Sequence, residues 1–335
     1  MADAGCTHVV METSSHALYL DRVYGVRYDV GIFTNLTQDH LDFHKTMENY
    51  AKAKAMLFEM VSSENQHKTG KSAWINIDDP YAHTMIEAVN TEVCPLHTYG
   101  MNDSSAELYA YDSKFTGKSS RFKVRYHEND YEVETRLAGR FNIYNTLGAI
   151  GAALNEGISM DDAIEAVKDF QSVPGRFELI DEGQSFAVVV DYAHTPDGLE
   201  KILGTAREIT EGKIIAVFGC GGDRDRMKRP IMGSIAAEHA DISIVTSDNP
   251  RTEDPEKIIE DVVVGVEKVK KNKPDLYYEV IADRRQAIKR AVSLAKDDDI
   301  VIIAGKGHED YQILKDRTIH FDDREEARNA LKEVK

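Results

Sequence analysis

The stretch AVVVDYAHTPDGL at residues 187–199 decides the fold of the second half of the chain. Its apolar run predicts a buried strand, and Thr195 with Pro196 predicts the start of a helix, because Thr caps helices and Pro suits the first helical position. The same pattern recurs to the end of the chain. Further strands are predicted at residues 213–218, 242–246, 276–281 and 299–304, and further helices from 230, from 255, over 284–295 and from 323. This alternation predicts an α/β fold with a doubly wound, mainly parallel sheet.

Residues 1–172 have a less regular pattern. Short β-branched runs and an alternating aromatic and polar segment predict strands at 8–13, 29–36 and 72–78 and a hairpin over 106–137 with its turn at 128–130. Helical spacing predicts helices at 47–61, 142–155 and 160–170, the last capped by Ser159 with Asp162. The VPG run at 173–175 separates the two patterns, so we expect two domains, at residues 1–172 and 173–335.

The composition is that of an acidic globular protein. The 335 residues are 42% hydrophobic and 30% charged, and 41 basic against 58 acidic residues give a net charge of −17. This excess works against binding to nucleic acid or to anionic membranes, because both need basic surface. The three cysteines, Cys6, Cys94 and Cys220, are too few and too far apart for a disulfide framework. We therefore expect a monomer in the reducing cytoplasm, with small molecules as its partners.

Polar residues follow six of the predicted strands, at the ends where open α/β sheets bind their ligands. The groups are residues 12–16, 34–44, 191–194, 219–225, 248–251 and 305–309. Any one group alone has the composition of a capped turn. Six of them together predict a ligand site.

Three common catalytic patterns fail in this sequence. The SSH run at 14–16 lacks the G-x-S-x-G elbow of hydrolases, so capping hydroxyls are the better interpretation. The glycines at 219–222 do not complete G-x-G-x-x-G, because Arg224 stands in place of the third glycine. The runs at 69–72 and 117–119 imitate the end of a phosphate-binding P-loop but lack its first glycine. The sequence therefore gives little support for a nicotinamide cofactor and contains no P-loop.

A metal site remains open in residues 34–44. His40 and His44 have the spacing of zinc ligands. The interleaved Asp39 and Asp42, with Glu12, favour a hard cation such as Mg²⁺. The alternative is a polar loop whose histidines and aspartates hydrogen-bond one another.

Two further groups carry charges that suit a small anionic or zwitterionic ligand. Residues 221–225 present both signs of charge. Asp248, Asn249, Pro250 and Arg251 place a guanidinium beyond a strand end, where it can bind a carboxylate or a phosphate through two hydrogen bonds. A tight turn and a solvated arginine are the alternatives.

Nine sequence motifs occur in a fixed order along the chain. They are ETSSHAL, FTNLTQDHLDFH, YAKAKAMLF, GRFNIYN, PGRFE, VDYAHTPDGL, VFGCGGDRD, SDNPRTEDP and AGKGHEDYQ. Together they closely resemble the Mur ligases of peptidoglycan synthesis. The resemblance implies a central ATPase domain followed by a Rossmann-like domain. In that family ATP phosphorylates a substrate carboxylate, and the amine of an incoming amino acid then attacks the acyl phosphate.

The resemblance also implies roles for single residues. Glu12 and His40 match the family's Mg²⁺ ligands, and Lys54 matches a lysine that is carbamylated and helps to hold Mg²⁺ near the phosphates. His194 is expected close to the reacting phosphates. The residues that match ATP contacts are Asn142, Asn145, Arg176 and Asp191.

Other positions match the two remaining substrates. Ser14 and Arg22 match contacts to a UDP-N-acetylmuramoyl-dipeptide, although Leu20 replaces a glutamine that is frequent there. Arg251 can pair with the distal carboxylate of meso-2,6-diaminopimelate, which lysine lacks, so the resemblance favours the diaminopimelate-adding members. The residues that match the amino-acid site are Arg224, Asp248, Asn249, Pro250, Arg251, Gly305 and Glu309.

The sequence departs from the family at its start. Family members begin with a uridine-nucleotide-binding domain and a G-T-x-G-K-T P-loop, and neither precedes Glu12. We therefore expect a central domain that is truncated at its N-terminus and a chain that is inactive alone. The alternatives are a non-catalytic diaminopimelate-binding protein, a lysine-adding Mur ligase, and another amide ligase such as a folylpolyglutamate synthetase.

We expect the purified chain to form no amide from ATP, UDP-N-acetylmuramoyl-L-alanyl-D-glutamate and diaminopimelate. The backbone and lysine of a P-loop supply much of the electrostatic stabilisation in phosphoryl transfer, and the sequence lacks both. An assay of phosphate release measures this, with a ligase that contains the P-loop as the positive control. Turnover by the chain itself would show that the P-loop is dispensable.

Overall fold

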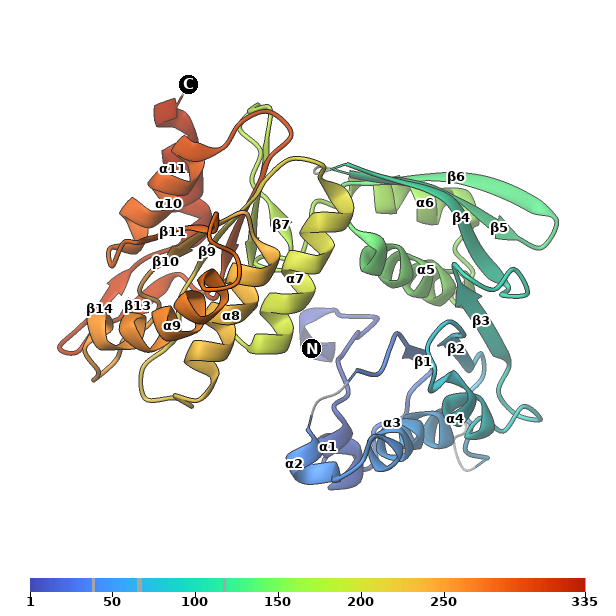
Figure 1. The fold of residues 1–335 in the computed structure, drawn as a ribbon. Helices are drawn as coiled ribbons and strands as arrows, with labels where there is room; N and C mark the ends of the chain where they lie inside the picture. The colour runs from blue at the N-terminus through green and yellow to red at the C-terminus, as the bar shows by residue number, and fades with distance from the viewer. Residues whose placement is uncertain (38–39, 65–67, 117–118, 335) are drawn as a thin grey trace. The chain divides into compact units, whose positions relative to one another are not determined.

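The computed structural model (Figure 1) describes residues 1–37, 40–64, 68–116 and 119–334. They form two compact units. The first unit comprises residues 1–113, 121–134 and 141–169, and the second comprises 114–120, 135–140 and 170–335. Within the described residues, every helix is too short or too polar to span a bilayer.

The first unit is built on a six-stranded sheet with the order β1-β2-β3-β4-β5-β6, in which β1 to β4 pair in parallel. The strands are β1 (Val30–Phe33), β2 (Ser72–Asn76), β3 (Leu96–Gly100), β4 (Leu108–Thr116), β5 (Ser119–Tyr126) and β6 (Asn129–Thr135). The helices are η1 (Ala2–Ala4), α1 (Ser15–Tyr19), α2 (Leu41–His44), α3 (Met47–Val61), α4 (Ala82–Glu87), α5 (Arg140–Asn155) and α6 (Met160–Asp169).

Helices cover both faces of this sheet. Phe58 of α3 and Met85 of α4 are buried in one cluster with Ile75 of β2. Trp74 directly precedes Ile75 in β2 and points to the opposite face, because side chains alternate along a strand. There α5 lies so close that a Cβ atom at Gly151 would come within 2.6 Å of the Trp74 ring. Strand β2 is therefore buried between α3 and α4 on one side and α5 on the other.

Most predictions for this unit are confirmed, and two are wrong. The helix over 47–61 is α3, and Ser159 accepts from the Asp162 N–H at 3.2 Å as the capping pattern predicts. Residues 8–13 are not a strand; Val10 is 98% exposed. An apolar run becomes a strand only where a neighbour completes its hydrogen bonds, and here β1 pairs with β2 instead. The hairpin turn lies at 127–128, not 128–130.

The second unit contains a six-stranded sheet with the order β11-β10-β9-β12-β8-β7, in which all neighbours are parallel except β7 and β8. The strands are β7 (Glu178–Leu179), β8 (Ala187–Asp191), β9 (Ile214–Phe218), β10 (Ile242–Val245), β11 (Tyr277–Val280) and β12 (Ile300–Ala304), with a separate hairpin of β13 (Tyr311–Ile313) and β14 (Thr318–His320). The helices are α7 (Pro196–Ile209), α8 (Lys228–His239), α9 (Pro255–Lys270), α10 (Arg284–Leu294) and α11 (Asp323–Val334).

This sheet is doubly wound, as the sequence predicts. Val189 of β8 is buried with Leu203 and Met232, under α7 and α8. Val190, the next residue, is buried on the other face with Ile288 and Leu331, under α10 and α11 (Figure 1). Strands buried on both faces are continuous apolar runs, which is why the sequence reveals them so clearly.

The element boundaries of the second unit follow the sequence closely. Thr195 caps α7 by accepting from the Gly198 N–H at 3.1 Å. Helix α8 begins at Lys228, before the predicted start at 230. The sequence predicts neither β7 nor the β13–β14 hairpin, since strands of two or three residues are too short to show a period.

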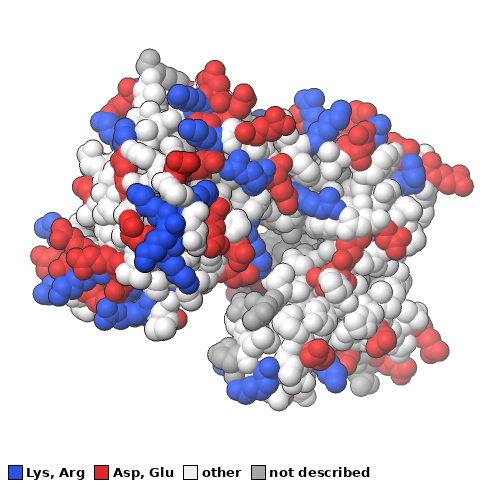
Figure 2. Space-filling view, in the orientation of Figure 1, with Lys and Arg blue, Asp and Glu red and all other residues white. Residues whose placement is uncertain are grey.

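Charged side chains of both signs are interspersed over the face that Figure 2 shows. A group of lysine and arginine side chains nonetheless gathers over part of the second unit, on the left of that view. A net acidic charge therefore leaves room for locally basic surface.

Substitution of Gly265 by alanine in α9 should destabilise the second unit. A Cβ atom at this position would lie 1.8 Å from the Pro230 carbonyl oxygen of α8, so the helices would have to move apart, at a cost of about 1–3 kcal/mol. Urea unfolding measures the change.

The matched control is Gly204→Ala in α7, where a Cβ atom would meet nothing within 4 Å. It should stabilise the protein by about 0.5–1 kcal/mol, because alanine is the better helix former. Equal effects of the two substitutions would contradict the close approach of α8 and α9.

Candidate functional site

Four of the six polar groups meet at one edge of the second sheet. Strands β8, β12, β9 and β10 lie side by side and run in parallel, so their carboxyl ends share that edge. The chain order reverses here, because β12 inserts between β8 and β9. Such a switch point is the usual ligand site of a doubly wound sheet. The other two groups, residues 12–16 and 34–44, belong to the first unit.

The loop after β10 is held firmly by the β13–β14 hairpin. Gln312 donates to the Asp248 carbonyl oxygen at 2.7 Å, and the Ile313 N–H donates to Asn249 Oδ1 at 2.9 Å. The Arg251 N–H in turn donates to the Ile313 carbonyl oxygen at 3.0 Å. Asp248 and Asn249 are thereby fixed although they lie in a loop, and both are buried.

A buried lysine orients two predicted site residues. The Lys306 side chain is fully buried and donates to Asn249 Oδ1 at 3.1 Å and to Glu309 Oε2 at 3.4 Å. Asn249 Nδ2 donates to the same Glu309 oxygen at 2.9 Å. The contacts of its carboxamide with Lys306, Glu309 and Ile313 fix which end of Asn249 carries the oxygen.

Gly305 lies against the Asp248 carboxylate. Its φ of +128° is an angle that residues other than glycine rarely adopt, and a Cβ atom there would lie 2.5 Å from Asp248 Oδ2. Asp248 Oδ1 accepts from the Asn249 N–H at 2.6 Å. Gly305 is therefore required by the position of the neighbouring carboxylate.

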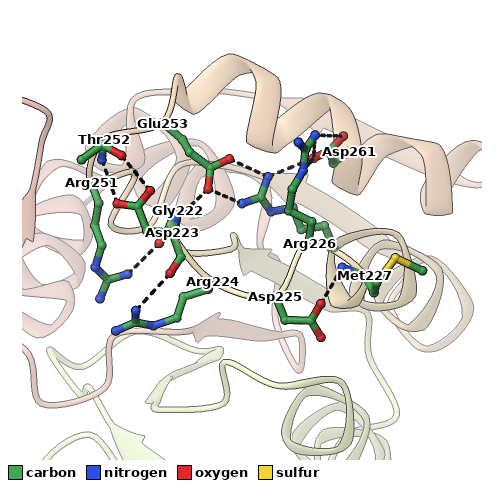
Figure 3. Close-up of polar contacts among 11 residues, drawn as sticks. Gly222, Asp223, Arg224, Asp225, Arg226, Met227, Arg251, Thr252, Glu253 and Asp261 are labelled. Carbon is green, nitrogen blue, oxygen red and sulfur yellow. Dashed lines mark hydrogen bonds and ion pairs between the residues drawn. The ribbon is translucent and has the colours of Figure 1, made fainter.

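Arg224 and Arg251 lie next to each other at this edge (Figure 3). Arg251 Nη1 donates to the Gly222 carbonyl oxygen and Arg224 Nη1 donates to the Asp223 carbonyl oxygen, both at 3.1 Å. These are the side-chain hydrogen bonds found for the two arginines within the described part of the chain. A guanidinium has five N–H donors, so most of those of the two arginines make no hydrogen bond within the described residues and are left for the carboxylates of a ligand.

The glycines after β9 serve contacts between loops. A Cβ atom at Gly219 would lie 2.2 Å from the Thr246 carbonyl oxygen, and one at Gly222 would lie 2.0 Å from the Pro250 carbonyl oxygen. Two backbones approach more closely than any side chain allows. The close packing of these two loops accounts for the glycines, so they are not evidence of a phosphate-binding loop.

A second cluster lies at the end of β8. The Phe177 and Ala193 N–H groups donate to the Asp191 carboxylate, each at 2.8 Å. The Arg176 guanidinium lies 5.0 Å from the centre of the Tyr192 ring. The His194 ring is 4.7 Å from the same centre, and Nδ1 of His194 is 2.9 Å from the Tyr192 carbonyl oxygen. The predicted residues Arg176, Asp191 and His194 thus lie together.

In the first unit, His40 and Lys54 approach one aromatic ring. The Lys54 ammonium is 5.9 Å from the centre of the Tyr50 ring, and the His40 ring centre is also 5.9 Å from it. His40 precedes α2 with a left-handed φ of +54°, whereas His44 is buried with Nε2 2.9 Å from Ser15 Oγ. The two histidines therefore have different surroundings.

The described residues of this region do not form a complete protein site for a metal. Glu12 is exposed. Among the described residues, no three His, Cys, Asp or Glu side chains converge as metal ligands would. Asp39 lies outside the described residues, and so does the side chain of Asp42.

The remaining predicted residues occupy α1 and α5. Ser14 caps α1 by accepting from the Ala17 N–H at 3.1 Å, and Arg22 is exposed in the turn after that helix. Asn145 donates to the Asn142 side chain at 3.2 Å, one turn along α5. These contacts explain local structure and leave a ligand role open.

The sequence places Lys306 in the polar group 305–309 without indicating a supporting role, and it does not single out Arg229 or Glu253. Lys306, Arg229 and Glu253 contact predicted residues or their loops, but each partner is distant in sequence or belongs to another element. The sequence does contain one signal: Lys306 stands between two glycines directly after a buried strand. A buried charge needs a partner, so a lysine at this position indicates a nearby carboxylate or amide oxygen.

Two family models match the chain. The model for the Mur ligase middle domain matches residues 1–153, and the model for the Mur ligase glutamate ligase domain matches residues 175–307. The chain belongs to the Mur ligase family.

This Mur ligase chain is similar to named relatives over nearly all of its length. It is 49% identical to UDP-N-acetylmuramoyl-L-alanyl-D-glutamate–2,6-diaminopimelate ligase 1 of Clostridium acetobutylicum and 50% identical to the ligase of that name of Syntrophomonas wolfei. The matches cover 98% and 97% of this chain and 64% of each relative. A solved structure of such a ligase has a TM-score of 0.71 at 37% identity, over 99% of this chain and 66% of that one. The chain thus spans about two thirds of the length of its relatives.

The Asp191 carboxyl should titrate above 3.8. Burial raises its pKa and outweighs the N–H groups of Phe177 and Ala193 and the Arg176 charge, which favour the ionised form. A raised pKa means that the folded protein binds this proton more tightly than the unfolded chain does. The stabilisation from Asp191 is therefore full below its unfolded pKa and is lost as the pH rises through its folded pKa.

Carbon-13 NMR of the carboxyl groups measures the midpoint. Asp103 is the comparator, since the Ser105 N–H lowers its pKa. A midpoint of 3.8 or below for Asp191 would contradict the dominance of burial.

Proposed function

We propose that this chain carries the nucleotide-facing and amino-acid-binding parts of an ATP-dependent ligase that joins meso-2,6-diaminopimelate to UDP-N-acetylmuramoyl-L-alanyl-D-glutamate. The adjacent guanidinium groups of Arg224 and Arg251, whose other N–H donors make no hydrogen bond within the described residues, carry the proposal. Sequence identities of 49% and 50% to ligases of this name support the proposal.

The amino-acid pocket fits a zwitterion that has a second carboxylate. Arg251 would bind the distal carboxylate of diaminopimelate, and Arg224 beside it would add positive charge. Asp248 and Glu309 offer carboxylates to an ammonium group, and Asn249 lies between them with its amide fixed. The remaining predicted contacts, Pro250 and Gly305, shape the backbone around these side chains. Bound lysine would offer Arg251 no carboxylate.

The proposed reaction forms an amide in two steps. The free D-glutamyl carboxylate takes the γ-phosphoryl group of ATP, which yields an acyl phosphate and ADP. The amine of diaminopimelate then attacks the acyl carbon, phosphate leaves, and the nitrogen loses a proton. Both steps need close alignment of three substrates, so fixed loops are a direct contribution to rate.

The residues on the nucleotide side are assigned from the resemblance of their motifs to those of the family. Arg176 would bind phosphate oxygens, Asp191 would hold the loop beside it, and His194 would lie near the reacting phosphates. Asn142 and Asn145 would contact the adenine side of ATP, while Ser14 and Arg22 would contact the UDP-linked dipeptide.

Glu12, His40 and Lys54 would serve magnesium. Mg²⁺ commonly takes only one or two protein ligands and completes its shell with phosphates and water, so a small set of side chains fits this ion. Carbamylation would turn Lys54 into an oxygen donor near His40. When bound, Mg²⁺ neutralises charge on the phosphates.

We further propose that the chain is a cytoplasmic monomer, from its acidic charge and scattered cysteines.

Substitution of Arg251 by alanine should weaken diaminopimelate binding by about 10- to 100-fold, because a hydrogen-bonded charge pair contributes about 1.5–3 kcal/mol. The affinity for lysine should stay within about twofold, since lysine has no distal carboxylate. Isothermal titration calorimetry of the purified chain measures both affinities.

Arg207→Ala is the matched control. Arg207 also pairs with a carboxylate, that of Asp241, which caps the first residue of β9 at the opposite edge of the sheet. This variant should bind diaminopimelate as the unmodified chain does. Equal loss of lysine and diaminopimelate binding in Arg251→Ala would refute the proposed role of the guanidinium.

A further inference from the structure

Two like charges are held side by side in the candidate amino-acid site. The Arg251 guanidinium donates to the Gly222 carbonyl oxygen, and the Arg224 guanidinium donates to that of the next residue, Asp223. A Cβ atom at Gly221 would lie 3.0 Å from Arg251 Nη1 and 3.8 Å from Arg224 Cγ, so both arginines pack on this glycine. Adjacent cations repel each other, so other contacts have to hold the two loops that carry them together.

Glu253 connects the two loops that carry the arginines (Figure 3). Its carboxylate accepts two hydrogen bonds from Arg229, at 2.8 and 3.0 Å. Glu253 Oε1 also accepts from the Asp223 N–H at 2.6 Å. One carboxylate therefore ties the loop that carries Arg224 to its own loop, which carries Arg251.

Asp223 completes the connection from the other side. Its carboxylate accepts from the Thr252 hydroxyl at 2.7 Å and from the Thr252 N–H at 3.2 Å. Asp223 and Arg251 both have left-handed φ angles, +53° and +52°. Such angles are costly for residues other than glycine and persist only where contacts enforce them.

Arg229 anchors this network in the helix layer. Its side chain is fully buried on α8, and Nη1 also donates to Asp261 of α9 at 2.9 Å. Arg226 contacts the same Asp261 carboxylate at 3.0 Å. Glu253 is thus fixed from α8 and α9, and its position does not depend on a ligand.

We propose that Glu253, held by Arg229, is a positioning residue that keeps Arg224 and Arg251 together and thereby sets the preference for an amino acid with a second carboxylate. This inference rests on the proposed diaminopimelate site. The contacts of Glu253 are with Arg229 and the Asp223 N–H, so its effect on a ligand would pass through the two arginines. Its loss should let the two loops separate, so that the distal carboxylate loses one of its two cationic partners.

The test is Glu253→Gln, which keeps the shape of the side chain but cannot accept both hydrogen bonds from Arg229. We expect diaminopimelate binding to fall about tenfold, an effect typical of residues that orient a ligand's direct partners. Lysine binding should stay within about twofold. Titration calorimetry gives both affinities, and their ratio is the readout that a general loss of folding would not change.

The matched control is Glu279→Gln. Both oxygens of Glu279 accept from Arg290, Oε1 at 2.7 Å and Oε2 at 3.0 Å, and the Glu279 side chain is 22% exposed against 27% for Glu253. It lies on β11 and touches neither loop of the site. This variant should leave both affinities unchanged.

Hydrogen exchange separates failure of this inference from failure of the proposed function. In Glu253→Gln the amides of 222–224 and 251–253 should exchange at least several-fold faster, with other loops unchanged. If the unmodified chain binds no diaminopimelate, the proposed function fails and the exchange result still decides whether Glu253 holds the loops. Unchanged exchange, or an unchanged ratio of affinities in a chain that binds, would overturn the inference.

Discussion

The parallel ladder of β8, β12, β9 and β10 is the constraint on which the candidate site depends. Parallel pairing places the carboxyl ends of neighbouring strands at one edge, so Asp191 lies opposite Ala304 although more than a hundred residues separate them. The crossover helices then have to cover both faces, and the loops that lead into them have to meet. The site is a consequence of this register.

Buried cations fix the loops at that edge. The Lys306, Arg229 and Arg284 side chains are all fully buried, and each meets a carboxylate. Arg284 pairs with Asp323 and also donates to the Ala304 carbonyl oxygen, directly before Gly305. Buried ion pairs gain little net stability, because desolvation offsets their attraction. Their contribution here is geometric: they hold polar loops in one arrangement.

The sequence predicted the scaffold well where a pattern is local. The apolar run of β8 and the Thr195 cap with Pro196 need only neighbouring residues, and both are confirmed. The run at 8–13 has the same local appearance, yet Val10 is exposed. A segment becomes a strand only when a neighbouring strand pairs with it, and a local sequence pattern does not indicate whether such a neighbour is present.

The polar motifs were found for a different reason. Asp248, Arg251 and Glu309 follow buried strands. Their positions in the sequence therefore predict that they lie at the same carboxyl edge of the sheet. Which residues support them was not visible. Arg229 and Glu253 are 24 residues apart on different elements, and nothing in either segment indicates the other.

The sequence by itself determined the family, the doubly wound sheet and the set of chemical groups at its carboxyl edge, because these follow from local periodicity and from ordered motifs. Only the tertiary structure decided which groups are buried, that Arg224 and Arg251 are neighbours, and that Glu253 and Lys306 hold the loops of the site. The reason is physical: hydrogen bonds and ion pairs act over a few ångströms in space, whatever the distance along the chain.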